Sequence, residues 1–256
     1  MIGAIAGDMI GAPYERFGIR HKDFEPVVSG FTDDTVLTVA TAQAILEKRD
    51  YGQAYRMLAR AYPDRGFGAA FAHWFQADAA APYNSWGNGA AMRVSPVGWA
   101  FDDQARVLSE ARQSAAVTHN HPEGIRGAQA TALAIWLARR GTDKETIRQT
   151  LAERFGYDLK RTVAAIRPNY RFEISCQRSV PEAIICFLEA TDFETAVRLA
   201  VSLGGDSDTQ ACIAGAIAEA FYGPVPETIR TAVDHRLPQA FRDTIARFTA
   251  TYLSPK

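Results

Sequence analysis

The sequence has little cysteine, no excess of one charge and no long apolar run, and each absence excludes a class of protein. Its three cysteines show no paired spacing, which argues against a disulfide framework or a zinc site. No stretch approaches the roughly 20 apolar residues of a membrane span. The first residues, MIGAIAGD, lack the basic segment of a signal peptide. We therefore expect a cytoplasmic protein in a reducing environment, with no membrane partner.

Charge and motif content exclude further classes. The 28 basic residues are balanced by 29 acidic ones, which gives no electrostatic reason to expect binding to nucleic acid. A Gly-x-Ser-x-Gly elbow, a Walker loop and a His-Glu-x-x-His zinc motif are all missing. The hydrophobic content of 47%, by contrast, is ordinary for a globular protein, and 256 residues are enough to bury a core.

Nearly every periodic segment has the spacing of a helix. Helices are expected at 34–48, 51–62, 90–101, 103–117, 124–140, 144–155, 181–190, 193–203, 209–222 and 238–253, and a small-residue helix precedes Pro13. Alternating strand patterns are scarce, and Tyr170 to Ser175 is the only short candidate. We predict an all-α fold in which residues 1–256 form a single domain.

Two acid-rich segments far apart in the chain are near copies of each other. TDDT at residues 32–35 and DSDT at residues 206–209 each run directly into an apolar helix. If the fold brings them together, four carboxylates converge and must be protonated or separated by cations. Oxygen ligands of this kind suit hard divalent cations such as Mg²⁺ or Mn²⁺.

The same two segments are also typical helix starts. Thr and Asp oxygens accept from the free N–H groups at a helix N-terminus, and negative charge there suits the helix dipole. Gly204 and Gly205, which precede the second segment, let the backbone turn sharply. A capped helix can also present its side chains to a metal, so the sequence leaves both interpretations open.

Three further segments carry candidate functional residues. The loop PYNSWGNGAAMR at residues 82–93 suits phosphate through exposed N–H groups, and Trp86 offers a flat face, although Asn-Gly is equally a common turn. His119 lies between two helices, where it is either functional or a cap. Glu15 by itself is a surface acid, and Asp8 would face a neighbouring helix end.

Taken together, these segments resemble the ADP-ribosylglycohydrolase family, which includes dinitrogenase-reductase-activating glycohydrolase and the vertebrate ADP-ribosyl-acceptor hydrolases. The likeness runs in the family's order through GDMIGAPYE, FTDDTVLTVATAQAIL, SWGNGAAMRVSPVG, THNHPEG and SVPEAIICFLEATDFETAVRLAVSLGGDSDTQACIAGAIAEAFYG. The resemblance implies a single-domain orthogonal multi-helix bundle with a central two-metal site.

The resemblance also implies a role for each matching residue. The expected ligands of two divalent cations, Mg²⁺ or Mn²⁺, are Thr32, Asp33, Asp34, Asp206, Asp208 and Thr209. The residues expected to bind the substrate are Ser85, Trp86, Gly87, Asn88 and Gly89 around the diphosphate, and His119 beside the distal ADP-ribose. Trp86 stands where the family more often has tyrosine. Glu15 matches a glutamate on a mobile flap, and either Glu15 or Asp34 is the candidate general base.

The implied activity is hydrolysis of the glycosidic bond between ADP-ribose and an acceptor, with a protein arginine side chain as the first candidate. Serine-linked, nucleobase-linked and O-acetyl-ADP-ribose are alternative substrates. An all-α Mg²⁺-dependent nucleotide pyrophosphohydrolase is a rival activity, and an ADP-ribose-binding module is a non-enzymatic one. The expected partner is an ADP-ribosylated protein or a small ADP-ribose conjugate, bound by a monomer.

Overall fold

The computed structural model describes residues 1–253, and all regular secondary structure in that range is helical. The helices are α1 (Ile2–Gly11), α2 (Asp33–Glu47), α3 (Tyr51–Ala61), α4 (Ala69–Gln76), α5 (Gly89–Met92), α6 (Ser95–Ala100), α7 (Gln104–Ala116), α8 (Pro122–Arg139), α9 (Lys144–Phe155), α10 (Val163–Ile166), α11 (Cys176–Glu189), α12 (Phe193–Val201), α13 (Ser207–Tyr222), α14 (Glu227–Arg236) and α15 (Gln239–Tyr252), with a 3₁₀ turn η1 at Ala12–Tyr14. The all-α prediction is confirmed. The expected domain of residues 1–256 includes 254–256, which lie outside the described range.

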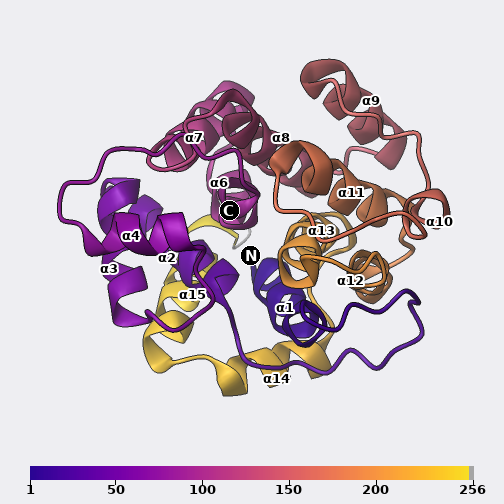
Figure 1. Ribbon diagram of the computed structural model, residues 1–256, viewed down its shortest axis with the longest axis horizontal. Helices are drawn as coiled ribbons and strands as arrows, with labels where there is room; N and C mark the ends of the chain where they lie inside the picture. Colours follow the sequence, from indigo (N-terminus) through magenta and orange to yellow (C-terminus); the bar gives the residue numbers. More distant parts are fainter. Residues whose placement is uncertain (254–256) are drawn as a thin grey trace.

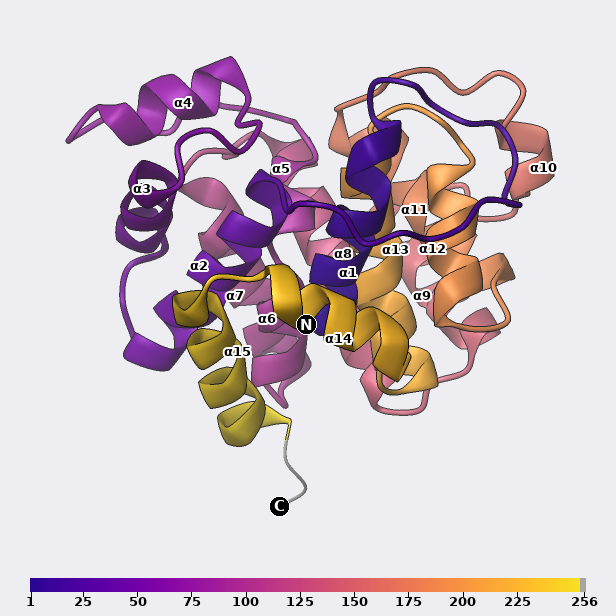
Figure 2. The ribbon, with the colours of Figure 1, turned by 90° about the horizontal axis from the view of Figure 1, so that it is seen from below.

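Helices α1 and α13 lie side by side at the centre of the fold (Figures 1 and 2), and α1 packs more extensively against α13 than against any other element. The helices α2 to α4 lie to one side of this pair and α9 to α12 to the other, while α14 runs across its base (Figure 1). A single continuous cluster of buried apolar side chains joins these elements.

A stripe of glycines explains how closely the central pair approaches. Gly3, Gly7 and Gly11 follow one another at helical spacing, and a Cβ on any of them would collide with the backbone of α13. At Gly7 the colliding atom would be the carbonyl oxygen of Ala211. Because only hydrogen fits at these positions, the two backbones are in contact. This contact fixes the end of α1 beside the start of α13.

Most expected helices are present within one or two residues of their predicted bounds, but two predictions are wrong. The helix expected at 90–101 is two short helices, α5 and α6, separated at Arg93 and Val94. Pro96 lies in the first turn of α6 and lacks the N–H that would continue α5. The helix expected to begin at Pro181 begins at Cys176, so the proline lies inside α11. Ser179 holds the first turn there by donating its hydroxyl to the carbonyl of Ser175 (2.8 Å).

The strand considered for Tyr170 to Ser175 does not form. Ser175 makes an isolated antiparallel bridge with Gly87, and no strand is assigned anywhere in residues 1–253. The bridge nevertheless connects this segment to residues 85–89, which we call the glycine loop, since the N–H of Asn88 donates to the carbonyl of Ile174 (2.7 Å). Across the same range, no helix has both the length and the hydrophobicity needed to cross a bilayer.

Candidate active site

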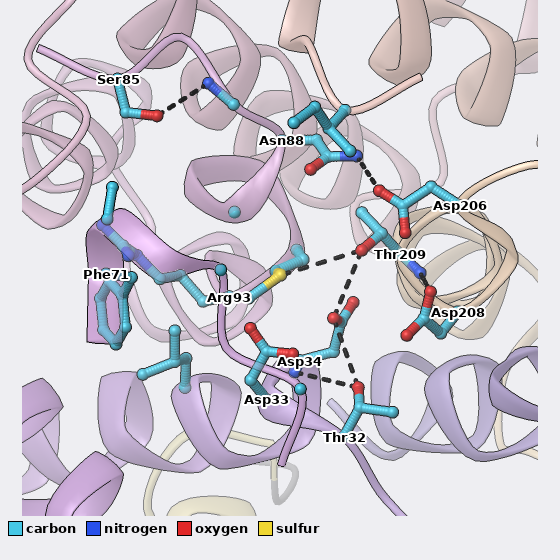
Figure 3. A pocket seen from close by; sticks show the side chains of 18 of the residues that line it. Thr32, Asp33, Asp34, Phe71, Ser85, Asn88, Arg93, Asp206, Asp208 and Thr209 are labelled. Atoms are coloured by element: carbon cyan, nitrogen blue, oxygen red, sulfur yellow. Dashed lines mark hydrogen bonds between the residues drawn. The ribbon is translucent and has the colours of Figure 1, made fainter. Parts of the chain in front are cut away.

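One cavity of about 450 Å³ collects almost all of the residues singled out from the sequence (Figure 3). Its walls come from the loop after α1, the starts of α2 and α13, the glycine loop before α5, and the segment before α11. The expected site residues that line it are Glu15, Thr32, Asp33, Asp34, Ser85, Gly87, Asn88, Gly89, His119, Asp206, Asp208 and Thr209.

Trp86 is the expected site residue that does not line the cavity. Its side chain is 52% exposed, and its ring packs edge-on against His121 with 5.7 Å between the ring centroids. The backbone carbonyl of Trp86 accepts from Cys176 (2.9 Å), which fixes the loop while the indole points elsewhere. The structure thus separates Trp86 from the other loop residues.

The two acid-rich turns meet in this cavity. Thr209 donates its hydroxyl to Oδ2 of Asp34 at 3.3 Å, and Figure 3 shows the two side chains pointing toward each other. Thr32 contacts the same carboxylate oxygen at 3.5 Å, and its own hydroxyl accepts from the N–H of Asp34 (3.3 Å) as the cap of α2. The first turn therefore caps α2 and also lies against the second turn, so both interpretations of the sequence apply.

The second turn depends on the glycines before it. Gly204 and Gly205 have φ values of +63° and +129°, which residues with a Cβ rarely adopt. They let the chain reverse directly before Asp206, whose Oδ2 accepts from the side-chain amide of Asn88 at 2.6 Å. The Asn88 side chain thereby connects the glycine loop to the acid cluster.

Burial and mutual repulsion raise the pKa of most carboxyls in the cluster. The pKa values of Asp33, Asp34 and Asp206 lie well above their ordinary value, first because of burial and then because of the charge of Asp208. The same two causes raise the pKa of Glu15, which lies on the exposed loop after η1. Without a cation, the cluster therefore keeps protons that ordinary surface carboxyls lose.

Asp8 is a cluster residue for which the sequence suggested only a structural contact. It is fully buried and accepts from the N–H and hydroxyl of Thr32 (3.1 and 2.8 Å) and from both groups of Thr35, so it does face a helix end. Burial and the charge of Asp208 outweigh these hydrogen bonds and raise the pKa of Asp8 to about 7. An aspartate inside the otherwise uncharged run IGAIAGDMIG, which forms α1, was the available signal.

The donor set fits a hard divalent cation. Carboxylate oxygens of Glu15, Asp206 and Asp208 lie within 4.8 Å of one another. Oδ1 of Asp34 is buried and has no hydrogen-bond partner among the described residues, which is costly unless a cation binds it. All the available ligand atoms are oxygen, as Mg²⁺ and Mn²⁺ prefer.

The glycine loop is more internally bonded than the sequence suggested. The N–H of Gly87 donates to Oγ of Ser85 (3.1 Å), and the N–H of Asn88 donates to Ile174. Helix α5, which follows, is only four residues long, so it adds little dipole. The two glycines instead leave room for His119, since a Cβ on Gly89 or Gly87 would lie 3.2 or 3.5 Å from its Nε2.

His119 is a buried neutral residue at the wall of the cavity. Burial, followed by the charge of Arg93, lowers the pKa of His119 well below its ordinary value. Its Nδ1 lies 2.7 Å from the hydroxyl of Thr118. Thr118 and Arg93 belong to segments highlighted in the sequence, but neither was assigned a role.

Several other lining residues were missed. Phe172 and Ile174 are 59% and 55% exposed, and they form an apolar part of the cavity wall. Exposing large apolar side chains to water is unfavourable, so these two suggest contact with a ligand. Tyr83, Arg93 and Phe71 also line it. Phe172 and Ile174 fall in the segment considered as a strand, where alternation was interpreted as secondary structure.

Comparison with known proteins shows the family of this chain. A sequence profile described as ADP-ribosylglycohydrolase matches residues 1–254. The chain belongs to the ADP-ribosylglycohydrolase family. The resemblance found in the sequence is thereby confirmed, and the chain is an ADP-ribosyl hydrolase that acts on glycosyl bonds of ADP-ribose.

Relatives of this ADP-ribosylglycohydrolase match over most of their length. ADP-ribosylhydrolase ARH3 of Mus musculus and that of Homo sapiens are each 30% identical to this chain in alignments of 313 positions, gaps included. These alignments cover 89% of this chain, 84% of the mouse protein and 86% of the human one. A solved structure described as an ADP-ribosylglycohydrolase-related protein complex is 25% identical with a TM-score of 0.77. The superposition covers 98% of this chain and 95% of the solved chain.

Proposed function

We propose that this ADP-ribosyl hydrolase releases ADP-ribose from its acceptor in a reaction that depends on two divalent cations. The observation that carries the proposal is the hydrogen bond from Thr209 to Asp34, which joins the two acid turns inside one cavity. A cluster of buried carboxyls with raised pKa values is unfavourable for stability alone, and it is typical of a functional site.

The residues that would hold the cations are those of the two turns, assisted by Glu15. They are Thr32, Asp33, Asp34, Asp206, Asp208 and Thr209. Divalent cations bound there would neutralise the carboxylate charges, coordinate sugar hydroxyls and lower the pKa of a water molecule. Asp8 takes a supporting role, because it binds the N–H groups and hydroxyls of Thr32 and Thr35 and so orients the start of α2.

The glycine loop orients the rest of the substrate. Asn88 spans the loop and the acid cluster through its bond to Asp206, so a diphosphate beside the loop has its distal ribose at the carboxylates. The buried ring of His119 lies beside the same glycines. Holding the substrate at both ends fixes the anomeric carbon at the acids and lowers the entropic part of the barrier.

Glu15 is our candidate for the residue that takes a proton from the attacking water. It is exposed, so it can return the proton to solvent, and its raised pKa brings it closer to neutral pH. Asp34 is less suited, because its carboxylate is buried away from solvent and its Oδ2 already accepts from the hydroxyl of Thr209. Nearby carboxylates stabilise the positive charge that develops at the anomeric carbon.

A protein arginine side chain is the acceptor we propose. Glu15 and Asp33 both retain solvent-accessible surface where they line the cavity, and their carboxyl oxygens can accept hydrogen bonds from a guanidinium, which has donors only. Turnover of arginine-, serine- and nucleobase-linked ADP-ribose and of O-acetyl-ADP-ribose, compared side by side, tests this choice. Faster release from any linkage other than arginine would contradict it.

Replacing Asp208 with alanine tests the reaction itself. We expect Asp208→Ala to abolish release of ADP-ribose from ADP-ribosylated protein, as removal of divalent cations should in the wild type. Asp23→Ala, on an exposed loop, is the matched control and should keep full activity. Unchanged helical circular dichroism verifies the fold, and full activity of Asp208→Ala would overturn the mechanism.

Product analysis separates the proposal from its rivals. Cleavage at the anomeric carbon gives intact ADP-ribose, whereas a pyrophosphohydrolase gives a mononucleotide. A binding module would bind ADP-ribose without turnover.

A further inference from the structure

A chain of buried polar contacts leads from Arg93 to the cavity. The Arg93 side chain is fully buried, and its Nη2 donates to the carbonyl of Ser114 and to the hydroxyl of Thr118, both at 2.9 Å. The Thr118 hydroxyl in turn lies 2.7 Å from Nδ1 of His119. These contacts connect the segment after α5, the end of α7 and the wall of the cavity.

The chemistry of the three groups fixes the direction of each hydrogen bond. A guanidinium has donors only, so the Thr118 oxygen must accept from Arg93. A hydroxyl has one proton, which is then free for one other neighbour. An unprotonated imidazole nitrogen is a strong acceptor, so the Thr118 proton is directed to Nδ1 of His119.

Tyr83 is the other neighbour that could take the Thr118 proton. Burial raises the pKa of Tyr83 to about 12, although Arg93 and the Thr118 hydroxyl oppose that rise. Tyr83 therefore keeps its own proton near neutral pH, and a neutral phenol oxygen accepts more weakly than an imidazole nitrogen. The proton assignment at Thr118 is thus set by the stronger acceptor.

His119 itself is neutral, because burial and the Arg93 charge lower its pKa. With Nδ1 as an acceptor, its single proton lies on Nε2. This is the nitrogen that faces Gly87 and Gly89, and no hydrogen bond among residues 1–253 uses it.

We propose that Arg93 and Thr118 are positioning residues that hold His119 in the tautomer protonated on Nε2, so that the ring presents a neutral hydrogen-bond donor to an anionic oxygen at the glycine loop. The anion is a phosphate of the substrate, and in this respect the inference rests on the proposed function. A neutral donor binds the diphosphate without adding a second buried positive charge beside Arg93.

The tautomer can be measured directly on the unliganded full chain. Long-range ¹H–¹⁵N correlation spectra near neutral pH distinguish a protonated from an unprotonated ring nitrogen, and a His119→Asn variant identifies the His119 signals among the five histidines. We expect a protonated Nε2 and an unprotonated Nδ1. The opposite tautomer, or rapid exchange between the two, would overturn the proposal whether or not the protein hydrolyses ADP-ribose.

Thr118 variants test the positioning role. Thr118→Val keeps the shape but removes the hydroxyl, so the His119 signals should shift toward a mixture of tautomers, and ADP-ribose should bind about tenfold more weakly in calorimetry. Thr118→Ser restores the hydroxyl and should restore both readouts.

If Thr118→Val binds ADP-ribose as tightly as the wild type while its tautomer changes, the link to the anion is wrong. If the wild type binds no ADP-ribose, the proposed function fails while the tautomer measurement still stands. Should Thr118→Val not fold, the wild-type spectrum decides the tautomer alone.

Discussion

The hydroxyl of Thr209 lies 3.3 Å from Oδ2 of Asp34 and donates to it, although the two residues are 175 positions apart. This contact links the first turns of α2 and α13, and the acid cluster is assembled around it. Because each turn carries only part of the oxygen ligands, neither can form the site alone.

Removing that hydroxyl should weaken metal binding. Thr209→Val keeps the volume of the side chain but leaves Oδ2 of Asp34 without one of its donors, so we expect Mn²⁺ affinity to fall about 10- to 100-fold. Titration calorimetry with Mn²⁺ measures the change, and Thr209→Ser should recover most of it. An unchanged dissociation constant in Thr209→Val would show that the hydroxyl does not organise the site.

Stability without metal should depend on pH in a defined direction. The pKa of Asp8 rises from 3.8 to about 7 on folding, and those of Asp33, Asp34 and Asp206 also rise, so the folded chain holds protons that the unfolded chain releases. Their contribution to stability is therefore fully present below the unfolded pKa and is lost as the pH rises toward 7 and above.

Divalent cations should offset this loss, because they replace the protons as counter-charges. We expect Mn²⁺ to raise the melting temperature more at about pH 8 than at about pH 5, in contrast to a metal site of unperturbed carboxyls. Thermal unfolding with and without Mn²⁺ measures the effect. A stabilisation that is larger at the lower pH would contradict the predicted proton–metal competition.

The contact between α1 and α13 should tolerate no side chain. Gly7→Ala places a Cβ against the carbonyl of Ala211, and because backbone must move to admit it, we expect a loss of about 3 kcal/mol or more in the free energy of unfolding. Gly30→Ala is the control, since nothing lies within 4 Å of its added Cβ, and it should change stability by less than about 0.5 kcal/mol. Equal denaturant midpoints for the two variants would refute the close packing.

Asn88 should matter for charge as well as for shape. Burial and the charges around Asp206 raise the pKa of that carboxyl, and the Asn88 amide partly offsets the rise. Asn88→Asp is nearly isosteric but places a second carboxylate where the amide donated at 2.6 Å, so the acid limb of the pH–rate profile should move to higher pH. Asn169→Asp, an exposed control, should leave the profile unchanged.

Local sequence patterns predicted the helices well because each depends on neighbours within a few residues. Periodicity placed α7 and α9 within a residue of their observed bounds, and the TDDT and DSDT segments do begin helices. The helix boundaries were wrong at Pro181, which is buried inside α11, and at 90–101, where Pro96 in the first turn of α6 separates it from α5. At Pro181 the buried position overrides the local preference of proline for a helix start, whereas the break before α6 was a local signal that the periodicity missed.

What the sequence determined by itself was the chemical inventory: the acids, the hydroxyls and the glycines, in an order that resembles one family. Only the tertiary structure decided which of them share a cavity, because the position of a side chain depends on helices far away in the chain. Asp8 of α1 accepts hydrogen bonds from the start of α2, while the Trp86 ring packs against His121. The chain of contacts from Arg93 through Thr118 to His119 likewise joins segments that the sequence alone does not connect.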